Sequence, residues 1–179
     1  EAPDGLWYKC KRCGDLSTSK EIKANFYKCP KCNYHIRIGS AEYFEILFEN
    51  EYEELFGNMI SRDVLEFSDM KPYKERLSEQ HQKTGLLDAI RVASGKIEGH
   101  PLVVCCMDFN FIGGSMGVVV GEKIAKAIDH CLETNTPLLI ISKSGGARMM
   151  EAAFSLMQMA KTSAKLTLLA KARIPYFSL

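Results

Sequence analysis

The chain has 179 residues, of which 46% are hydrophobic and 25% are charged, and its formal net charge is +1. These proportions are ordinary for a soluble globular protein. No apolar run reaches the roughly 18 residues that a membrane helix needs, and the first residues lack the basic-then-apolar layout of a signal peptide. We therefore expect a cytoplasmic protein. Because the sequence lacks an initiator Met, we expect its first residue to be a fragment boundary.

The small net charge hides an uneven distribution along the chain. Residues 1–39 hold eight basic and four acidic residues, whereas residues 41–83 hold five basic and eleven acidic residues. We interpret these blocks as at least two structural units. The basic segments are suited to meeting phosphate, on a cofactor or on a nucleic acid.

Four of the seven cysteines form two C-x2-C pairs with fifteen residues between them: Cys10, Cys13, Cys29 and Cys32. In a chain without an export layout, this spacing predicts a tetrahedral zinc site rather than two disulfides or four free thiols. Since all four positions are Cys, no coordination position is open and the metal is expected to be structural. The residues that follow the pairs, Gly14 and Asn33, suit the left-handed backbone that turns amides towards the sulfurs.

Residues 9–37 are thus expected to form a small β-rich ribbon whose folding free energy comes largely from metal. His35 and His100 are interpreted as surface or turn residues, not as ligands. Five aromatic residues are expected in the ribbon core: Trp7, Tyr8, Phe26, Tyr27 and Tyr34. Surplus basic residues leave nucleic-acid contact at the ribbon open as an alternative: Lys9, Lys11, Arg12, Lys28 and Lys31.

Residues 40–87 are predicted to be a helical connector with little chemistry of its own. Ser40 is a plausible N-cap for a helix that carries Tyr43, Phe44, Leu47 and Phe48 at helical spacing. A second helix is predicted over residues 72–83, with a proline at its first turn and a glycine just past its end.

From residue 88 the pattern becomes α/β. Strands are predicted over 89–97 and 102–108, around a turn at 98–101, and over 138–142 and 174–179. A helix after the loop at 111–117 should bury Val120, Ile124, Ala127, Ile128 and Cys131 or Leu132. A long helix should end near residue 173. Alternating strands and helices predict right-handed crossovers on a largely parallel sheet.

The two glycine-rich loops, at 113–117 and 144–148, each join a strand to a helix. Consecutive glycines let backbone N–H groups turn into a cavity, and a helix N-terminus adds its positive dipole. Such a loop suits a phosphate or a forming enolate, but it is equally a tight strand-to-helix turn. Neither loop fits a nucleotide fingerprint. Asp108 and Glu122 are possible acids, and the methionines are interpreted as core filling: Met107, Met149, Met150, Met157 and Met159.

Seven segments resemble the β-subunit family of bacterial-type acetyl-CoA carboxylase carboxyltransferases. They are long, in family order and spread along the whole chain: LW (6–7), the four-cysteine ribbon, KTGL (83–86), MDFNFIGGSMG (107–117), VGEKI (120–124), SGGARM (144–149) and SLMQMAKTS (155–163). Three positions depart from the family pattern. Met150 stands for a usual Gln, Ala152 for a usual Gly, and Asn33 for a usual Gly.

The resemblance implies a crotonase-like (ClpP/crotonase) fold and the transfer of a carboxyl group from carboxybiotin to acetyl-CoA, giving malonyl-CoA for fatty-acid synthesis. It implies biotin carried on a biotin carboxyl carrier protein, a carboxyltransferase α subunit and a biotin carboxylase as partners, and a CoA thioester as substrate. Acetyl-CoA must pass through a thioester enolate, which aimed backbone amides stabilise. Gly145 and Gly146 are therefore expected to line the catalytic pocket. Arg148 and Lys123 are expected to contact CoA phosphates, and Gly113 and Gly114 to bind substrate.

The resemblance also sets the expected domains: a zinc ribbon at 1–39, the connector at 40–87 and the first part of the carboxyltransferase domain at 88–179. Family members continue beyond residue 179 into a second Gly-Gly oxyanion loop. We therefore expect this chain alone to form no malonyl-CoA. The rival hypothesis is a zinc-ribbon nucleic-acid-binding module with a non-catalytic α/β scaffold.

Overall fold

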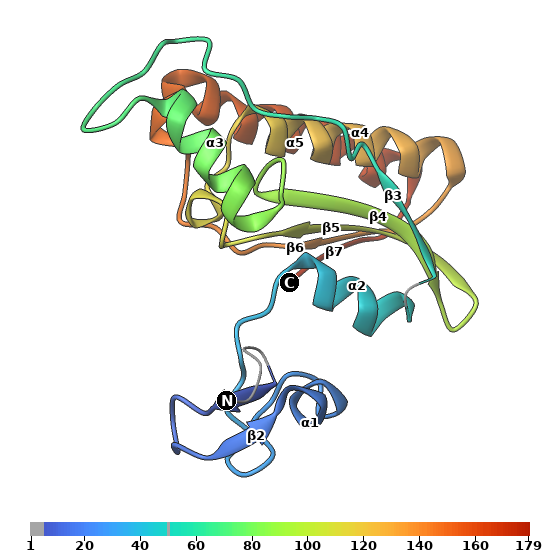
Figure 1. The fold of residues 1–179 in the computed structure, drawn as a ribbon. Coiled ribbons are helices and arrows are strands. Elements are labelled where there is room, and N and C mark those ends of the chain that lie inside the picture. Colours follow the sequence, from blue (N-terminus) through green and yellow to red (C-terminus); the bar gives the residue numbers. More distant parts are fainter. Residues whose placement is uncertain (1–5, 50) are drawn as a thin grey trace. The chain divides into compact units, whose positions relative to one another are not determined.

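The computed structural model describes residues 6–49 and 51–179, which form two compact units that divide between Ile38 and Gly39 (Figure 1). Among these residues, no helix is both long enough and apolar enough to cross a membrane.

The first unit is a small ribbon. Strands β1 (Trp7–Lys9) and β2 (Leu16–Thr18) pair antiparallel and lead into helix α1 (Ser19–Ala24). A capping box in which Thr18 and Glu21 bond each other's backbone amides starts this helix. Trp7 is 58% exposed and Phe26 is 66% exposed, so the prediction that both lie in the ribbon core is wrong. A unit of this size has too little interior for five aromatic rings.

The second unit is built on a five-stranded sheet in the order β3-β4-β5-β6-β7. The strands are β3 (Tyr52–Leu55), β4 (Ile90–Ile97), β5 (His100–Met107), β6 (Leu138–Ile141) and β7 (Tyr176–Ser178). The β3–β4 and β4–β5 pairs are antiparallel, whereas β5–β6 and β6–β7 are parallel. The predicted strands are present, but the sheet is mixed and not largely parallel.

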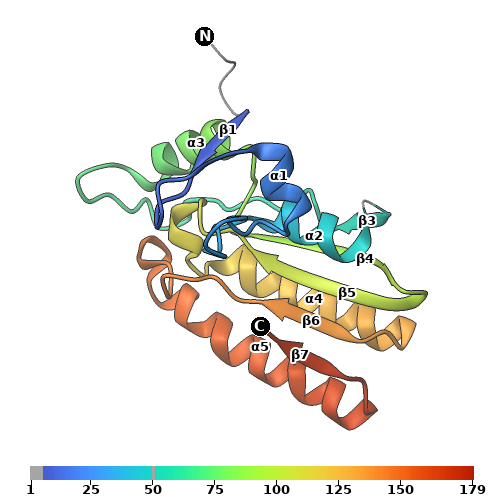
Figure 2. The ribbon, with the colours of Figure 1, turned by 90° about the horizontal axis from the view of Figure 1, so that it is seen from below.

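The alternation of side chains along β4 and β5 gives the sheet two apolar faces. Val92, Val103 and Cys105 pack on the face that carries α4 (Val118–Thr134), whereas Ala93 and Val104 pack under α2 (Ser40–Phe48). Helix α5 (Ala152–Ala172) runs beside α4 on the first face, as Figures 1 and 2 show. The predicted inward residues of α4 are buried, with Leu132 half-buried.

The segment 40–87, predicted to be a helical connector, contains α2, the added strand β3 and α3 (Tyr73–Thr84). Ser40 is not an N-cap. Gly39 takes that position, and the amide of Ser40 donates to Oδ1 of Asp108 at 2.7 Å. The hydrogen-bond acceptor at the start of α2 is therefore a carboxylate 68 residues away in the sequence, and not the Ser40 side chain.

Two tight turns lie where the sequence predicts them. Gly85 ends α3 with a φ of 70°, in the left-handed region. Glu98 and Gly99 have φ values of 49° and 82° and connect β4 to β5. His100 is exposed, as expected, but it begins β5 instead of lying in the turn.

The methionines divide between core and surface. Met107 and Met150 are 5% and 6% exposed, so core filling is confirmed for these two. Met149, Met157 and Met159 are more than half exposed, so that interpretation is wrong for them. The last two lie on α5, beside other exposed apolar side chains: Phe154, Leu156 and Leu168. This helix therefore presents an apolar surface to solvent.

Candidate functional site

The four predicted metal ligands meet in the ribbon. The Sγ atoms of Cys10, Cys13, Cys29 and Cys32 all lie within 4.8 Å of one another. The Cys10–Cys32 and Cys13–Cys29 sulfurs are 3.6 and 3.7 Å apart. A disulfide has its sulfurs about 2 Å apart, whereas the edges of a zinc–thiolate tetrahedron are about 3.8 Å. The set therefore has the spacing of a four-thiolate metal site and not of two disulfides.

Backbone hydrogen bonds favour the thiolate form at Cys10, whereas burial raises the pKa of the Cys32 thiol to about 12. Hydrogen bonds from the backbone amides of Cys13 and Arg12 lower the pKa of the Cys10 thiol to about 6, although burial opposes the shift. Gly14 and Asn33 have φ values of 71° and 55°, which confirms the left-handed backbone predicted for the two positions. His35 is exposed, and the cluster contains no imidazole.

The two glycine-rich loops are joined to each other. They follow β5 and β6, which are parallel, so both lie at the carboxyl end of the sheet. The N–H of Gly145 donates to the carbonyl of Gly113 at 2.9 Å, and Met116 forms a parallel bridge with Ala147. A Cβ on Gly114 would stand 2.1 Å from the carbonyl oxygen of Lys143. Glycine is required there because the two backbones touch.

The amides of Gly145 and Gly146 do not point into an open pocket. The first serves Gly113, and the N–H of Gly146 donates to Oγ of Ser144 at 3.0 Å. The next amide differs. In the parallel bridge, Met116 bonds the residues on either side of Ala147, so the N–H of Ala147 points the other way. Among the described residues it has no hydrogen-bond acceptor, and Ala147 is exposed.

Arg148 is fully buried at the centre of a polar cluster. Its guanidinium makes a bidentate ion pair with Asp88 at 2.7 and 3.0 Å and donates to Glu151 at 3.2 Å. Nε and Nη2 also donate to the side-chain and main-chain oxygens of Ser115, at 3.1 and 2.9 Å. The remaining contacts of Nη1 are to Ser61 and Tyr73. The cluster thus ties the connector to both glycine loops.

Electrostatics hold this cluster together. Burial by itself would lower the pKa of Arg148, but hydrogen bonds to Asp88 raise it above its ordinary value. Burial also raises the pKa of Tyr73, so this phenol keeps its proton and donates to Glu151 at 2.7 Å. Every guanidinium N–H has an acceptor inside the protein. The placement therefore argues against the expected contact between Arg148 and a CoA phosphate.

Lys123 lies elsewhere, 2% exposed, with Nζ donating to the carbonyl of Ile90 at 3.2 Å. Burial lowers its pKa. It lines a cavity of about 500 Å³ together with Glu54, Asp88 and Arg91. The structure therefore does not bring Lys123 and Arg148 to a shared exposed anion site.

The sequence interpretation missed the partners of Arg148. Asp88, Ser61 and Tyr73 lie in or next to the segment treated as a connector, and no local pattern marks them. The i, i+3 spacing of Arg148 and Glu151 was the one available signal. Of the two acids named from the sequence, Asp108 is 4% exposed, and its Oδ2 has no hydrogen-bond partner among the described residues. Glu122 pairs with Lys161.

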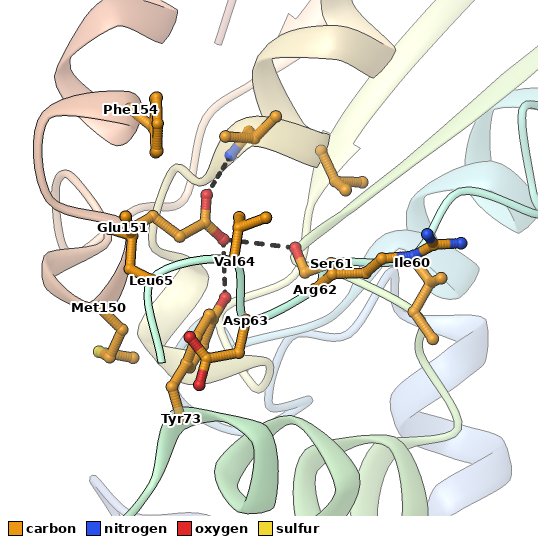
Figure 3. A pocket seen from close by; sticks show the side chains of 12 residues that line it. Ile60, Ser61, Arg62, Asp63, Val64, Leu65, Tyr73, Met150, Glu151 and Phe154 are labelled. Atoms are coloured by element: carbon orange, nitrogen blue, oxygen red, sulfur yellow. Dashed lines mark hydrogen bonds between the residues drawn. The ribbon is translucent and has the colours of Figure 1, made fainter. Parts of the chain in front are cut away.

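An apolar cavity of about 250 Å³ opens beside the cluster (Figure 3). Figure 3 shows Glu151 between Tyr73 and Ser61 on one wall, with hydrogen bonds to both. Its other carboxylate oxygen accepts from the backbone N–H of Val118 at 2.5 Å. Val64, Leu65 and Phe154 supply apolar walls. The hydrogen-bonding groups of the Glu151 carboxylate are therefore satisfied within the protein, and the cavity surface is mainly hydrocarbon.

A mixed sheet with two joined glycine loops at its carboxyl end defines an α/β domain whose candidate site is built from backbone groups. Residues 60–179 match the family model described as the carboxyl transferase domain, so the chain belongs to the carboxyl transferase family. It is 65% identical over 180 residues to the acetyl-coenzyme A carboxylase carboxyl transferase subunit beta of Pedobacter heparinus, and 63% identical to that of Amoebophilus asiaticus. Both alignments cover 100% of this chain and 64% of the relative.

Solved structures give the same fold. A transcarboxylase 12S structure with hydrolysed methylmalonyl-coenzyme A bound is 23% identical, with a TM-score of 0.61, over 84% of this chain and 25% of that one. A Pseudomonas malonate decarboxylase hetero-tetramer in complex with malonate is 26% identical, with a TM-score of 0.55, over 73% of this chain and 46% of that one. The expected crotonase-like carboxyltransferase fold is confirmed.

Proposed function

We propose that the chain is part of the β subunit of an acetyl-CoA carboxylase carboxyltransferase, which moves a carboxyl group from carboxybiotin to acetyl-CoA and forms malonyl-CoA. The joined glycine loops at the carboxyl ends of β5 and β6 carry this proposal, in a chain of the carboxyl transferase family. The chain spans 64% of the length of the curated relatives it matches. The substrates, the cytoplasmic location and the partners therefore belong to the proposal.

The chemistry needs a group that stabilises negative oxygen on a thioester. When acetyl-CoA loses its α proton, charge develops on the carbonyl oxygen, and a fixed N–H donor is worth about 3–4 kcal/mol at such an oxygen. We assign this role to the 145–147 segment, with the free N–H of Ala147 as the donor. Gly145 and Gly146 then shape the loop. Gly113 and Gly114 hold it against the neighbouring loop.

Arg148 is a positioning residue in this scheme. Its contacts with Ser115 and Asp88 fix the segment that carries the donor amide, in place of the CoA phosphate contact expected from the sequence. Fixed donors stabilise a transition state because they need no reorganisation when charge appears. Lys123 faces carboxylates in its own cavity, so we do not assign it to CoA either.

The four thiolates would hold a structural zinc ion, which stabilises the ribbon and leaves no open coordination position. The carboxyl donor would be biotin on a biotin carboxyl carrier protein, charged by a biotin carboxylase. A carboxyltransferase α subunit would complete the site. The exposed apolar side chains of α5 are typical of a protein–protein interface, which agrees with a partner subunit.

The test is the reaction itself. The complete β subunit that contains this chain is mixed with the α subunit and with carboxylated carrier protein, and malonyl-CoA is measured after addition of acetyl-CoA. We expect turnover, and we expect Arg148→Met to lower kcat more than it raises KM. Full activity in the absence of this subunit, or none in its presence with the other components competent, would contradict the proposal.

A second candidate function, nucleic-acid contact at the ribbon, is favoured by one observation. Trp7 and Phe26 are exposed, and the exposed residues Lys9 and Lys23 lie two and three positions from them in the sequence, a combination that suits base stacking next to phosphate contacts. Filter binding to RNA and DNA at two salt concentrations tests it. Affinity that falls steeply with salt and that is lost in Trp7→Ala supports it, because phosphate contacts release counterions. Salt-independent or absent binding argues against it.

A further inference from the structure

A third cavity, of about 400 Å³, lies between the loop at 61–63 and helix α3. Six of its seven lining residues are polar or charged, whereas the apolar cavity that shares residues 61–63 is walled mainly by hydrocarbon. We propose that this cavity binds a phosphate group, held by Arg62, Lys74 and the side chains around them.

Helix α3 presents one of the two walls. Lys74, Ser78 and His81 are spaced i, i+4 and i+7, which places all three on one face of the helix. Leu77 is 5% exposed and anchors this face to the core. A cation, a hydroxyl and an imidazole therefore face the cavity from a rigid element.

The imidazole is held in place. The His81 ring stacks on Phe111 with centroids 5.6 Å apart and an interplanar angle of 27°. Its Nε2 lies 3.2 Å from the carbonyl oxygen of Leu87. A group fixed by two contacts loses little conformational entropy when a ligand binds.

The charge balance of the cavity favours an anion. Two basic side chains close to it are already neutralised, because Lys71 pairs with Glu79 and Arg76 pairs with Asp69. In the part of the chain that the structure describes, neither Arg62 nor Lys74 has a carboxylate partner. The one acidic residue of the lining, Asp63, accepts the backbone N–H of Phe67 at 3.1 Å. The lining therefore carries two cations and one carboxylate, a net charge of +1 that favours an anionic ligand.

The site adjoins the glycine loops through two contacts. Arg62 directly follows Ser61, whose hydroxyl bonds Asp88 and Arg148 in the buried cluster. Phe111, beneath His81, also faces the guanidinium of Arg148 at 5.6 Å. The cavity is thus connected to the glycine loops through buried side chains. That CoA supplies this phosphate rests on the proposed function, whereas a free diphosphate has the same chemistry.

Isothermal titration of the zinc-loaded chain with CoA and, separately, with inorganic pyrophosphate tests the inference. Arg62→Gln combined with Lys74→Gln should weaken binding about tenfold or more, because two charge-assisted contacts are lost. Lys83→Gln removes a cation from the same helix outside the cavity and should leave the affinity unchanged. Lys74→Arg, which keeps the charge, should restore most of the affinity lost in Lys74→Gln.

The results of these titrations distinguish CoA from a free phosphate compound as the ligand of the cavity. Variant-sensitive CoA binding that pyrophosphate displaces supports the site with CoA as the ligand. Variant-sensitive pyrophosphate binding without CoA binding supports a site for a free phosphate compound, and malonyl-CoA formation by the assembled enzyme then decides the proposed function independently. The inference is overturned if neither probe binds, if the double variant binds as tightly as wild type, or if Lys83→Gln weakens binding equally.

Discussion

The ribbon and the sheet unit are stabilised in different ways. In the described part of the ribbon, the buried residues are Cys10, Ser17, Ile22 and Cys29. The sheet unit has two apolar clusters, one on each face, and a fully buried ion-pair cluster at one end. Two of the four buried ribbon residues, Cys10 and Cys29, belong to the four-cysteine cluster. We therefore expect the ribbon to depend on a bound metal, whereas the larger unit depends on apolar burial.

This difference predicts which changes destabilise each unit most. A small unit whose core is a metal site loses its structure when the metal leaves, since metal binding and folding are one event. A larger unit tolerates most single changes, but not the removal of one partner from a buried ion pair. The following tests separate the two cases.

Removal of zinc should have the largest effect. Structural zinc contributes about 10–16 kcal/mol in small metal-dependent domains, so chelation should unfold residues 9–37 and leave the sheet unit folded. Limited proteolysis and amide hydrogen exchange report this difference. Cys13→Ser should lower the zinc content, whereas Cys131→Ser, in the buried helix α4, should not. Equal protection of the ribbon with and without metal would show that it does not depend on zinc.

Replacement of Arg148 should be the next most damaging change. Arg148→Met leaves Asp88 and Glu151 buried without their cation, so we expect a loss of about 3–5 kcal/mol in the free energy of unfolding. Urea denaturation of the sheet unit measures it. Lys171→Met, at an exposed position of α5, is the control and should change stability by about 0.5 kcal/mol or less. Similar losses in both variants would exclude a special role for the cluster.

Contact between the glycine loops predicts a smaller loss. Gly113 and Gly114 have φ values of 63° and 66°, so an alanine at either position costs about 1 kcal/mol of backbone strain. Only at Gly114 does the added Cβ also collide with Lys143. We expect about 3 kcal/mol for Gly114→Ala and about 1 kcal/mol for Gly113→Ala in urea denaturation. Equal values would mean that the loops are not in close contact.

The smallest expected effect is an increase in stability. Ala152 has φ 46° and ψ −130°, a backbone region that favours glycine, and it stands where the resembling family usually has Gly. Relief of strain should exceed the entropy cost of glycine, so Ala152→Gly should stabilise the protein by about 1 kcal/mol. Ala153→Gly, one residue into α5, should destabilise it by about 0.5–1 kcal/mol. Thermal denaturation of both variants measures these changes, and destabilisation by Ala152→Gly would contradict the presence of backbone strain at Ala152.

Local chemistry allowed several features to be predicted from the sequence. The spacing of the four cysteines predicted their cluster, and Gly14 and Asn33 took the expected left-handed backbone. The α3 boundaries were predicted to within one residue, because Pro72 and Gly85 mark its ends. Each of these features depends on residues close together in the chain.

Features that depend on distant partners were not predicted. The hydrogen-bond acceptor for the first backbone N–H of α2 is Asp108, and not the side chain of Ser40. Strand β3, which pairs with β4, lies within the segment predicted to be a helical connector. The burial of Arg148, which argues against the expected phosphate contact, was not predicted for the same reason. Nothing near residue 148 in the sequence indicates that Asp88, Ser61 and Tyr73 will enclose its side chain.

The sequence by itself determined the helices and strands from residue 88 onward, the four-cysteine set and the two glycine loops, because spacing and turn chemistry act over a few residues. Only the tertiary structure decided which amide remains free. Packing of the second loop against the first pairs the N–H of Gly145 with Gly113 and leaves the N–H of Ala147 free, whereas the N–H of Gly146 bonds Ser144 within its own loop. Hydrogen bonding is a competition between all nearby acceptors, and the fold sets which acceptors are near.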